Sequence, residues 1–147
     1  MAQTREANAK WSGDLLSGRG SVSASTTGVF SDLPVTWASR IGEPDGLTSP
    51  EELLATAHAA CYSMAVSNEL AKAGTPPDSI ATKVAITADK LDTGWTVQAA
   101  HITVRGRVPG ATPETFREAA DKAKDGCPIS KALKGNVQLS VDATLEQ

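Results

Sequence analysis

Two cysteines are the side chains of this sequence with the clearest capacity for chemistry, Cys61 in "HAACYSM" and Cys127 in "GCP". A cysteine acts as a nucleophile in its thiolate form, and a free thiol with a pKa of about 8.5 is only a few per cent ionised at neutral pH. Burial in an apolar helix raises that pKa further. A reactive Cys61 therefore needs a cation beside it. The candidates for this cation are His58, Arg19 and Arg40.

His58 precedes Cys61 by three residues and shares its helix face. It has three interpretations: a Cys–His catalytic pair, a metal site completed by His101 or Cys127, or a buried or interface histidine with a hydrogen-bond partner. Cysteine hydrolases usually hold the histidine on a separate element. No CxxC or HxxxH spacing supports a metal site. We therefore expect the third interpretation and no metal.

Each cysteine also has a simple packing interpretation, because a buried thiol behaves as a small hydrophobic group. Cys127 continues the apolar face of a helical pattern that includes Phe116. In a reducing compartment a structural disulfide is disfavoured, whereas a transient catalytic disulfide is compatible with it. The residues alone leave packing and redox chemistry open for both cysteines.

Glu51 and Glu52 open the helical segment that carries Cys61, and acidic residues are favoured in a first helical turn. Glu51 lies ten residues before Cys61, which is roughly 15 Å along a straight helix. It therefore cannot touch the sulfur directly. A glutamate bound to an arginine could instead hold the guanidinium against the sulfur.

The segment "SPEELLATAHAACYSMAVSNELAKAG" predicts a long helix. Ser49 suits the N-cap, Pro50 the first helical position, and Glu52 completes a capping box. Gly74 marks the end. Residues 53–66 are apolar or small on nearly every face, which is typical of a helix buried all round. A small domain has difficulty surrounding such a helix, so we expect a second subunit to cover part of it.

Alternating apolar residues predict strands over much of the remaining chain. These strands are expected near 22–26, 35–37, 84–88, 95–104 and 137–145. In the fourth, the apolar phase changes after Ala99, which predicts a bulge near Ala100–His101. Adjacent strands form hairpin-like pairs rather than βαβ units, which indicates an α+β, mostly antiparallel fold.

A second helix is expected to begin at Thr112–Pro113 and to end at Gly126. Phe116 and three alanines mark its apolar face. The following "PISKAL" is expected to form a turn or a short helix.

The length of 147 residues fits a single domain over 1–147. The net charge is −3 and no Lys or Arg cluster forms a stripe, which argues against a nucleic-acid partner. No run of eighteen apolar residues is present, so we expect no membrane association. The first eleven residues lack the apolar run of a secretory signal, so we expect a cytoplasmic protein.

The pair of motifs "SPEELLATAHAACYSMAVS" and "AKDGCPISKAL" resembles the OsmC/Ohr family of thiol-dependent hydroperoxide reductases, and the OsmC branch in particular. The resemblance extends from "WSGDLLSGRGSVS" to the last strand. It implies an intertwined homodimer of α+β subunits in which the long cysteine-bearing helices pack together at the centre. It also implies two active sites at the dimer interface and no metal, flavin or haem.

Carried over by motif, Cys61 corresponds to the peroxidatic cysteine, Cys127 to the resolving cysteine and Glu51 to the catalytic glutamate of the family. Arg40 in "TWASRIGEPDG" matches the arginine of the OsmC branch, which lies in the strand before the loop. Arg19 in "SGRGS" matches the arginine of the Ohr branch. We favour Arg40, and Trp37 fits the aromatic residue that usually precedes that loop.

The resemblance implies an antioxidant, stress-response peroxidase that reduces organic hydroperoxides, and hydrogen peroxide less well. Cys61 becomes a sulfenic acid, a Cys61–Cys127 disulfide follows, and an external dithiol or lipoylated protein reduces it. An interface lined by apolar side chains would favour organic substrates. The apolar side chains expected at this interface are Leu53, Leu54, Tyr62, Met64 and Ile129.

Two other classes of function stay open. One is a dimeric thiol redox-sensing or ligand-binding module without rapid turnover. The other is a metal-binding or Cys–His hydrolytic protein, for which His58 or a metal would be indispensable and Cys127 would not.

Overall fold

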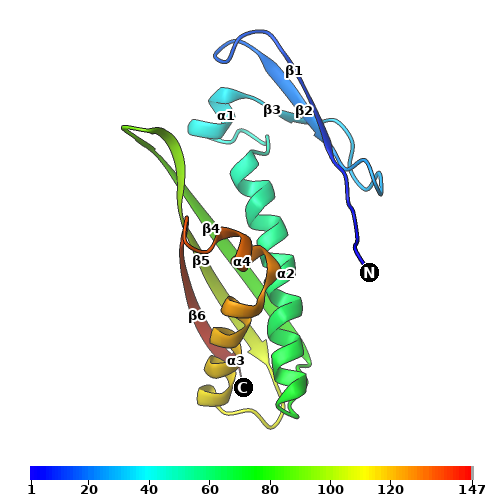
Figure 1. Ribbon diagram of the computed structural model, residues 1–147, viewed down its shortest axis with the longest axis vertical. Coiled ribbons are helices and arrows are strands. Elements are labelled where there is room, and N and C mark those ends of the chain that lie inside the picture. Colours follow the sequence, from blue (N-terminus) through cyan, green and yellow to red (C-terminus); the bar gives the residue numbers. More distant parts are fainter. Residues whose placement is uncertain (147) are drawn as a thin grey trace. The chain divides into compact units, whose positions relative to one another are not determined.

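The computed structural model describes residues 1–146, and the chain divides into two compact units, Met1–Leu53 and Leu54 onward (Figure 1). Helices and strands are both present in each unit, in agreement with the expected α+β class. None of the helices in the described residues is long and apolar enough to cross a membrane.

The first unit contains a three-stranded antiparallel sheet. Its strands are β1 (Asn8–Ser12), β2 (Arg19–Ser23) and β3 (Leu33–Val35), in the order β1-β2-β3. A side chain at Gly20 would lie 2.6 Å from the Trp11 ring, so the glycine lets this ring pack over the sheet.

A short helix, α1 (Trp37–Ile41), follows β3 where the sequence predicted a continuing strand. The hydroxyl of Thr36 accepts the backbone N–H of Ser39, and the Ser39 hydroxyl accepts the backbone N–H of Thr36. This reciprocal capping box starts a helix immediately after Val35. The expectation that Trp37 and Arg40 lie in a strand was therefore wrong, because both are helical.

The long helix α2 (Pro50–Lys72) has the predicted bounds. The Ser49 hydroxyl accepts the backbone N–H of Glu52 at 3.1 Å, and the Glu52 carboxylate accepts the Thr48 hydroxyl at 2.6 Å. At the other end Gly74 has φ +82°, a left-handed conformation that glycine adopts without strain.

Within the single chain, α2 is not buried all round as the sequence suggested. Its buried residues recur every four positions and form one stripe: His58, Tyr62, Val66 and Leu70. Met64, on a different face, is 68% exposed. That a second subunit covers this face remains a prediction.

The second unit contains a three-stranded sheet with the order β4-β5-β6. The strands β4 (Ser79–Leu91) and β5 (Gly94–Arg107) form an antiparallel hairpin. The last strand, β6 (Gln138–Glu146), is parallel to β5, and α3 (Pro113–Gly126) and α4 (Pro128–Leu133) form the crossover between them. The expectation that βαβ units are absent was therefore wrong for the last strand.

The predicted change of phase in β5 occurs two to three residues before the expected position. Thr87 pairs with Ala99 and Ala88 with Val97, so Gln98 is the extra residue of a bulge. Beyond the bulge, Ala100 begins a regular alternation of buried positions along β5. The bulge thus sets the phase that turns the second half of β5 toward the core.

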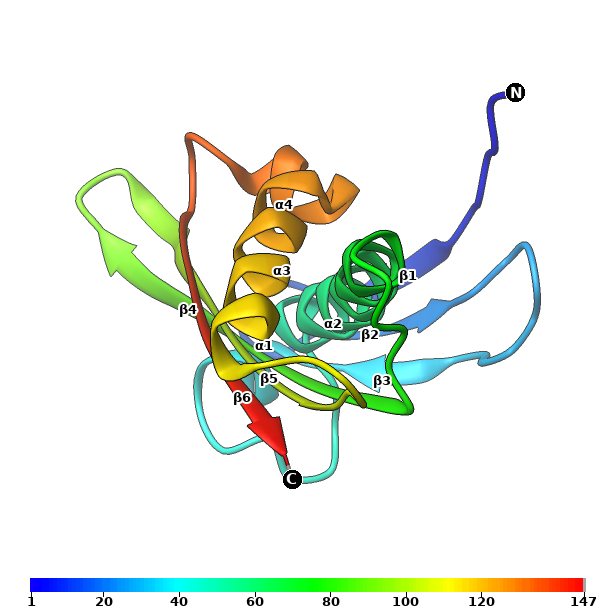
Figure 2. The same ribbon diagram turned by 90° about the horizontal axis from the view of Figure 1, so that it is seen from below.

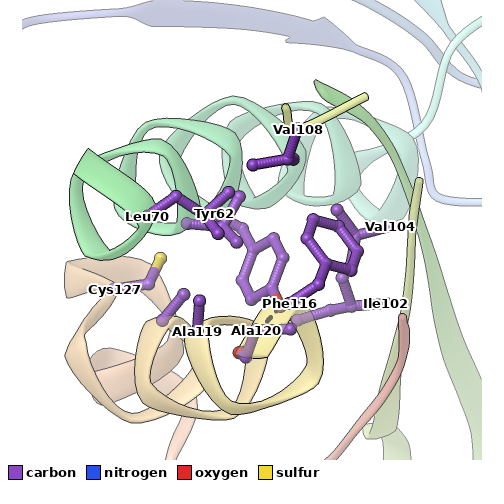
Figure 3. Close-up of a cluster of buried hydrophobic side chains, with 11 residues drawn as sticks. Tyr62, Leu70, Ile102, Val104, Val108, Phe116, Ala119, Ala120 and Cys127 are labelled. Carbon is purple, nitrogen blue, oxygen red and sulfur yellow. Dashed lines mark hydrogen bonds between the residues drawn. The ribbon is translucent and has the colours of Figure 1, made fainter. Parts of the chain in front are cut away.

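The helices α2 and α3 lie on the same face of this sheet (Figure 2), and the main core of the unit fills the space between them. The Tyr62 hydroxyl donates to the Ala120 carbonyl at 2.8 Å and joins the two helices (Figure 3). Phe116 packs against Gly106 so closely that a Cβ there would lie 2.5 Å from its ring. The sequence-predicted apolar face of α3 is confirmed by the burial of Phe116, Ala119, Ala120 and Ala123.

Candidate active site

The two cysteines meet in the second unit. The thiols of Cys61 and Cys127 are within hydrogen-bond distance, with 3.1 Å between the two Sγ atoms, and both cysteines are free thiols. A disulfide bond is about 2.05 Å long, so a closure of roughly 1 Å would join them. Figure 3 shows the Cys127 sulfur turned toward α2, the helix that carries Cys61.

Cys127 is held by the junction of two helices. It is the C-cap of α3 and the N-cap of α4, and its extended backbone (φ −61°, ψ 125°) redirects the chain between them. Its N–H donates to the Ala123 carbonyl at 2.8 Å, and its carbonyl accepts the N–H of Lys131 at 2.9 Å. Pro128 begins α4 without needing an N–H partner. Both helices therefore fix the backbone of Cys127.

The two thiols differ in their access to solvent. Cys127 has no exposed surface, whereas Cys61 is partly buried and borders a hollow of about 440 Å³. Met64, Asn68 and Pro128 also line this hollow. Cys61 lines this hollow and Cys127 does not, so Cys61 is the cysteine nearer to a small molecule that enters it.

The surroundings of Cys61 within this unit disfavour its thiolate. Burial is the largest cause that raises the pKa of Cys61, followed by the hydrogen bond with Cys127 and the charge that Cys127 would carry. The backbone N–H of Ile129 acts in the opposite direction and lowers the pKa. Reactivity of Cys61 therefore calls for an additional cation, as the sequence analysis argued.

Arg40 and Glu51 form an ion pair in the first unit. Arg40 Nε donates to both Glu51 carboxylate oxygens at 3.1 and 3.2 Å, and Nη2 donates to Oε1 at 2.8 Å. The guanidinium also lies over the Trp37 ring, 5.7 Å from its centroid. The glutamate–arginine contact that the sequence analysis considered is thus present, between the last turn of α1 and the first turn of α2.

An apolar hollow of about 450 Å³ adjoins this ion pair. Arg40 supplies a charged side chain to it, and most of the other lining side chains are apolar. These lining side chains include Trp11, Leu15, Val35, Trp37 and Leu53. Arg19, the alternative arginine, is exposed at the first position of β2 and does not line this hollow.

His58 is fully buried, and its Nε2 lies 2.8 Å from the Ser130 hydroxyl on α4. Burial lowers the pKa of His58 and so favours the neutral ring. The prediction of a buried histidine with a hydrogen-bond partner is confirmed. His101, the other histidine, contacts Asp142 and Ser140, and residues 1–146 contain no group of three His, Cys, Asp or Glu residues arranged to hold a metal.

The structure therefore pairs the four expected site residues two by two: Cys61 with Cys127, and Arg40 with Glu51. Sequence reasoning missed Ser130 in "PISKAL", which is 1% exposed. Its only signal in the sequence was a small polar residue one turn after the cysteine–proline pair. Sequence reasoning also missed the contact of Arg40 with the Trp37 ring, because it placed both residues in a strand.

A family model described as OsmC-like protein matches residues 42–142. Peroxiredoxin OsmC of Escherichia coli is 39% identical over 139 residues, covering 95% of this chain and 96% of that protein. The organic hydroperoxide resistance protein OhrB of Bacillus subtilis is 29% identical over 96 residues, covering 65% of this chain and 68% of that protein.

Solved structures share the fold. The crystal structure of OhrB of Bacillus subtilis has a TM-score of 0.71 at 22% identity and covers 94% of this chain and 97% of its own. An OsmC-like protein of unknown function from Vibrio cholerae has a TM-score of 0.75 at 14% identity, covering 97% and 99%. The resemblance stated from the sequence is confirmed. The chain belongs to the OsmC/Ohr family, and its higher identity to OsmC than to OhrB favours the OsmC branch.

Proposed function

We propose that this protein is a thiol-dependent peroxidase that reduces organic hydroperoxides, and hydrogen peroxide less well. The observation that carries the proposal is the pair of free thiols 3.1 Å apart, one of which borders solvent while the other is buried. The membership of the OsmC/Ohr family and the 39% identity to Peroxiredoxin OsmC support the same reaction.

The proposed cycle begins at Cys61. Its thiolate attacks the distal oxygen of the hydroperoxide, the O–O bond breaks, an alcohol leaves, and Cys61 becomes a sulfenic acid. The sulfur of Cys127 then attacks the sulfenic sulfur, the S–O bond breaks and water leaves. The resulting disulfide is returned to two thiols by exchange with a dithiol or a lipoylated protein. None of these steps calls for a metal or an organic cofactor.

Arg40 is the proposed source of the missing cation. A guanidinium against Cys61 would stabilise the thiolate and the charge that develops on the departing oxygen. The ion pair with Glu51 and the Trp37 ring would fix its orientation. We favour Arg40 over Arg19 because Arg40 is the arginine that contacts Glu51.

We further propose an intertwined homodimer, in which the exposed face of α2 packs against a second copy. Ala57, Ala60 and Met64 are exposed on this helix, and their small or flexible side chains suit close packing. The two compact units would then serve one functional domain. A cytoplasmic location fits a cycle that begins and ends with two free thiols.

An organic substrate is favoured by the hollow beside Arg40. Its lining is mostly apolar, so the hydrocarbon part of a hydroperoxide would leave water there while the peroxide group lies toward the guanidinium. Hydrogen peroxide has no such hydrocarbon part and would gain nothing from this surface.

The test is peroxide consumption by the reduced, metal-free protein with a dithiol reductant. Cumene hydroperoxide is compared with hydrogen peroxide for the wild type, Cys61→Ser and Cys127→Ser, and mass spectrometry follows the sulfur species. Rapid turnover that Cys61→Ser abolishes, with a Cys61–Cys127 disulfide in the wild type, is expected. Equal, slow consumption by all three proteins would refute the peroxidase. Disulfide formation without turnover would favour the redox-sensing module instead.

A further inference from the structure

Two contacts join α2 to the start of α4, one helical turn apart. Cys61 contacts Cys127 through their sulfurs, and His58 contacts Ser130 at 2.8 Å. His58 precedes Cys61 by three residues, and Ser130 follows Cys127 by three residues. Residues three apart on a helix share a face, so the two contacts lie side by side along the same helix–helix seam.

We propose that His58 is a positioning residue for the resolving step, in which its hydrogen bond to Ser130 holds the first turn of α4 and therefore keeps Cys127 against Cys61. This inference rests on the proposed function. Cys127 then captures the Cys61 sulfenic acid before a second hydroperoxide molecule reaches it.

On the α4 side, the junction that holds Cys127 needs such an anchor. The helix α4 has six residues, and a helix of this length has little stability of its own. Cys127 stands at the bend between α3 and α4, so a small rotation of α4 would move its sulfur. The sulfurs must approach from 3.1 Å to the length of a disulfide, and a fixed α4 keeps that approach short.

Stability alone is a weak reason for a histidine at position 58. Its Nδ1 is buried without a hydrogen-bond partner among the described residues, and an unpaired polar atom in a core carries a free-energy cost. An apolar side chain of similar volume would avoid that cost. The arrangement that buries no unpaired N–H has the proton on Nε2, which then donates to Ser130 Oγ. The histidine therefore makes the hydrogen bond to Ser130 and leaves its Nδ1 atom buried without a partner.

The fate of the sulfenic acid reports on this role directly. In resolution, the Cys127 thiol and the Cys61 sulfenic acid form a disulfide and release one water. In the competing reaction, the sulfenic acid takes one oxygen from a second hydroperoxide, which leaves as an alcohol, and Cys61 becomes a sulfinic acid. The ratio of disulfide to sulfinic acid at a given hydroperoxide concentration measures how fast Cys127 attacks.

The experiment treats the reduced full-length protein with increasing cumene hydroperoxide, without reductant, and counts both products by mass spectrometry. The variants are His58→Leu, His58→Gln and Ser130→Ala. Ser63→Ala is the matched control, because the Ser63 hydroxyl also joins α2 to another element, donating to Thr82 on β4 at 2.7 Å. The rate at which the Cys61 thiol is consumed is measured separately for each protein.

We expect His58→Leu and Ser130→Ala to raise the ratio of sulfinic acid to disulfide by about tenfold, the effect of one lost buried hydrogen bond. His58→Gln keeps an N–H donor and should stay near the wild type, as should Ser63→Ala. The double variant of His58→Leu with Ser130→Ala should be no worse than either single variant, because both remove the same bond. The rate of Cys61 consumption should be unchanged throughout.

An unchanged ratio in Ser130→Ala and His58→Leu would overturn the positioning role. So would an equal slowing of Cys61 consumption in both variants, which would indicate general structural damage. Failure of the peroxidase itself would look different. If the wild type forms neither disulfide nor sulfinic acid, the inference is overturned as well. If the wild type forms the disulfide but does not turn over with a dithiol, the peroxidase fails and the product ratio still decides the role of His58. Should His58→Leu not fold, Ser130→Ala decides the outcome alone.

Discussion

At the scale of single residues, the site assigns different surroundings to two chemically identical side chains. Cys61 borders a hollow, whereas Cys127 has no exposed surface and is fixed by two helix ends. In the proposed cycle, this difference in access would separate the cysteine that meets the hydroperoxide from the cysteine that attacks the sulfenic acid. The sequence pointed to both cysteines through their motifs, but their difference in exposure follows from tertiary packing, which the local pattern does not contain.

The first prediction concerns the arginine. Arg40→Lys should lower the rate of Cys61 oxidation by cumene hydroperoxide by about a hundredfold, since a lysine cannot reproduce the fork that Nε and Nη2 present to Glu51. The rate is measured by stopped-flow loss of the thiol. Arg19→Lys is the matched control and should behave as the wild type. If only Arg19→Lys lowered the rate of Cys61 oxidation, Arg19 would be the arginine that activates Cys61.

The second prediction concerns the protonation of His58. Burial lowers the pKa of His58, so the unfolded chain binds its proton more readily than the folded chain does. The free energy of unfolding should therefore fall as the pH drops below about 6.5, the ordinary pKa of histidine, until the lowered folded pKa is reached. Urea unfolding between about pH 7.5 and pH 5 measures this loss.

In this range His58→Gln should lose less stability than the wild type. The prediction would be contradicted if the free energy of unfolding fell equally at low pH in the wild type and in His58→Gln.

At the scale of elements, the limits of sequence analysis can be traced to particular causes. The bounds of α2 were predictable because its capping residues and its terminal glycine are local signals. The helix α1 was missed because its five residues follow an extended pattern, and the Thr36–Ser39 capping box that starts it was overlooked. The direction of β6 was not predictable, because apolar alternation is the same in parallel and antiparallel strands.

The third prediction tests the packing of α3 on the sheet. In Gly106→Ala the new Cβ would lie 2.5 Å from Phe116 and 2.9 Å from Ile80. The crowding should lower the free energy of unfolding by about 1–3 kcal/mol in urea titration. Gly126→Ala is the control, because no neighbour lies within 4 Å of that Cβ and alanine favours a helix more than glycine does. A loss of stability in Gly126→Ala as large as that in Gly106→Ala would refute the crowding argument.

At the scale of the whole molecule, the proposed chemistry would use the Arg40–Glu51 pair of the first unit and the cysteines of the second. All four residues could be identified from the sequence because they match the motifs of the family. Neither the apolar periodicity nor the spacing of the residues indicates whether the two pairs meet within one chain or between two. If the proposed homodimer brings the two pairs together, disruption of the dimer should also reduce the activity.

The fourth prediction tests this link through the exposed face of α2. Ala60→Lys places a charge on this face, and in the proposed homodimer that charge would be buried without a partner. We expect sedimentation analysis to show a shift from dimer to monomer, and turnover with cumene hydroperoxide to fall by tenfold or more, about the effect of misplacing one catalytic group. Glu118→Lys, on the exposed side of α3, should leave both properties unchanged. A dimer that persists in Ala60→Lys would place the interface elsewhere. A fully active monomer would mean that one chain assembles the arginine and the cysteines by itself.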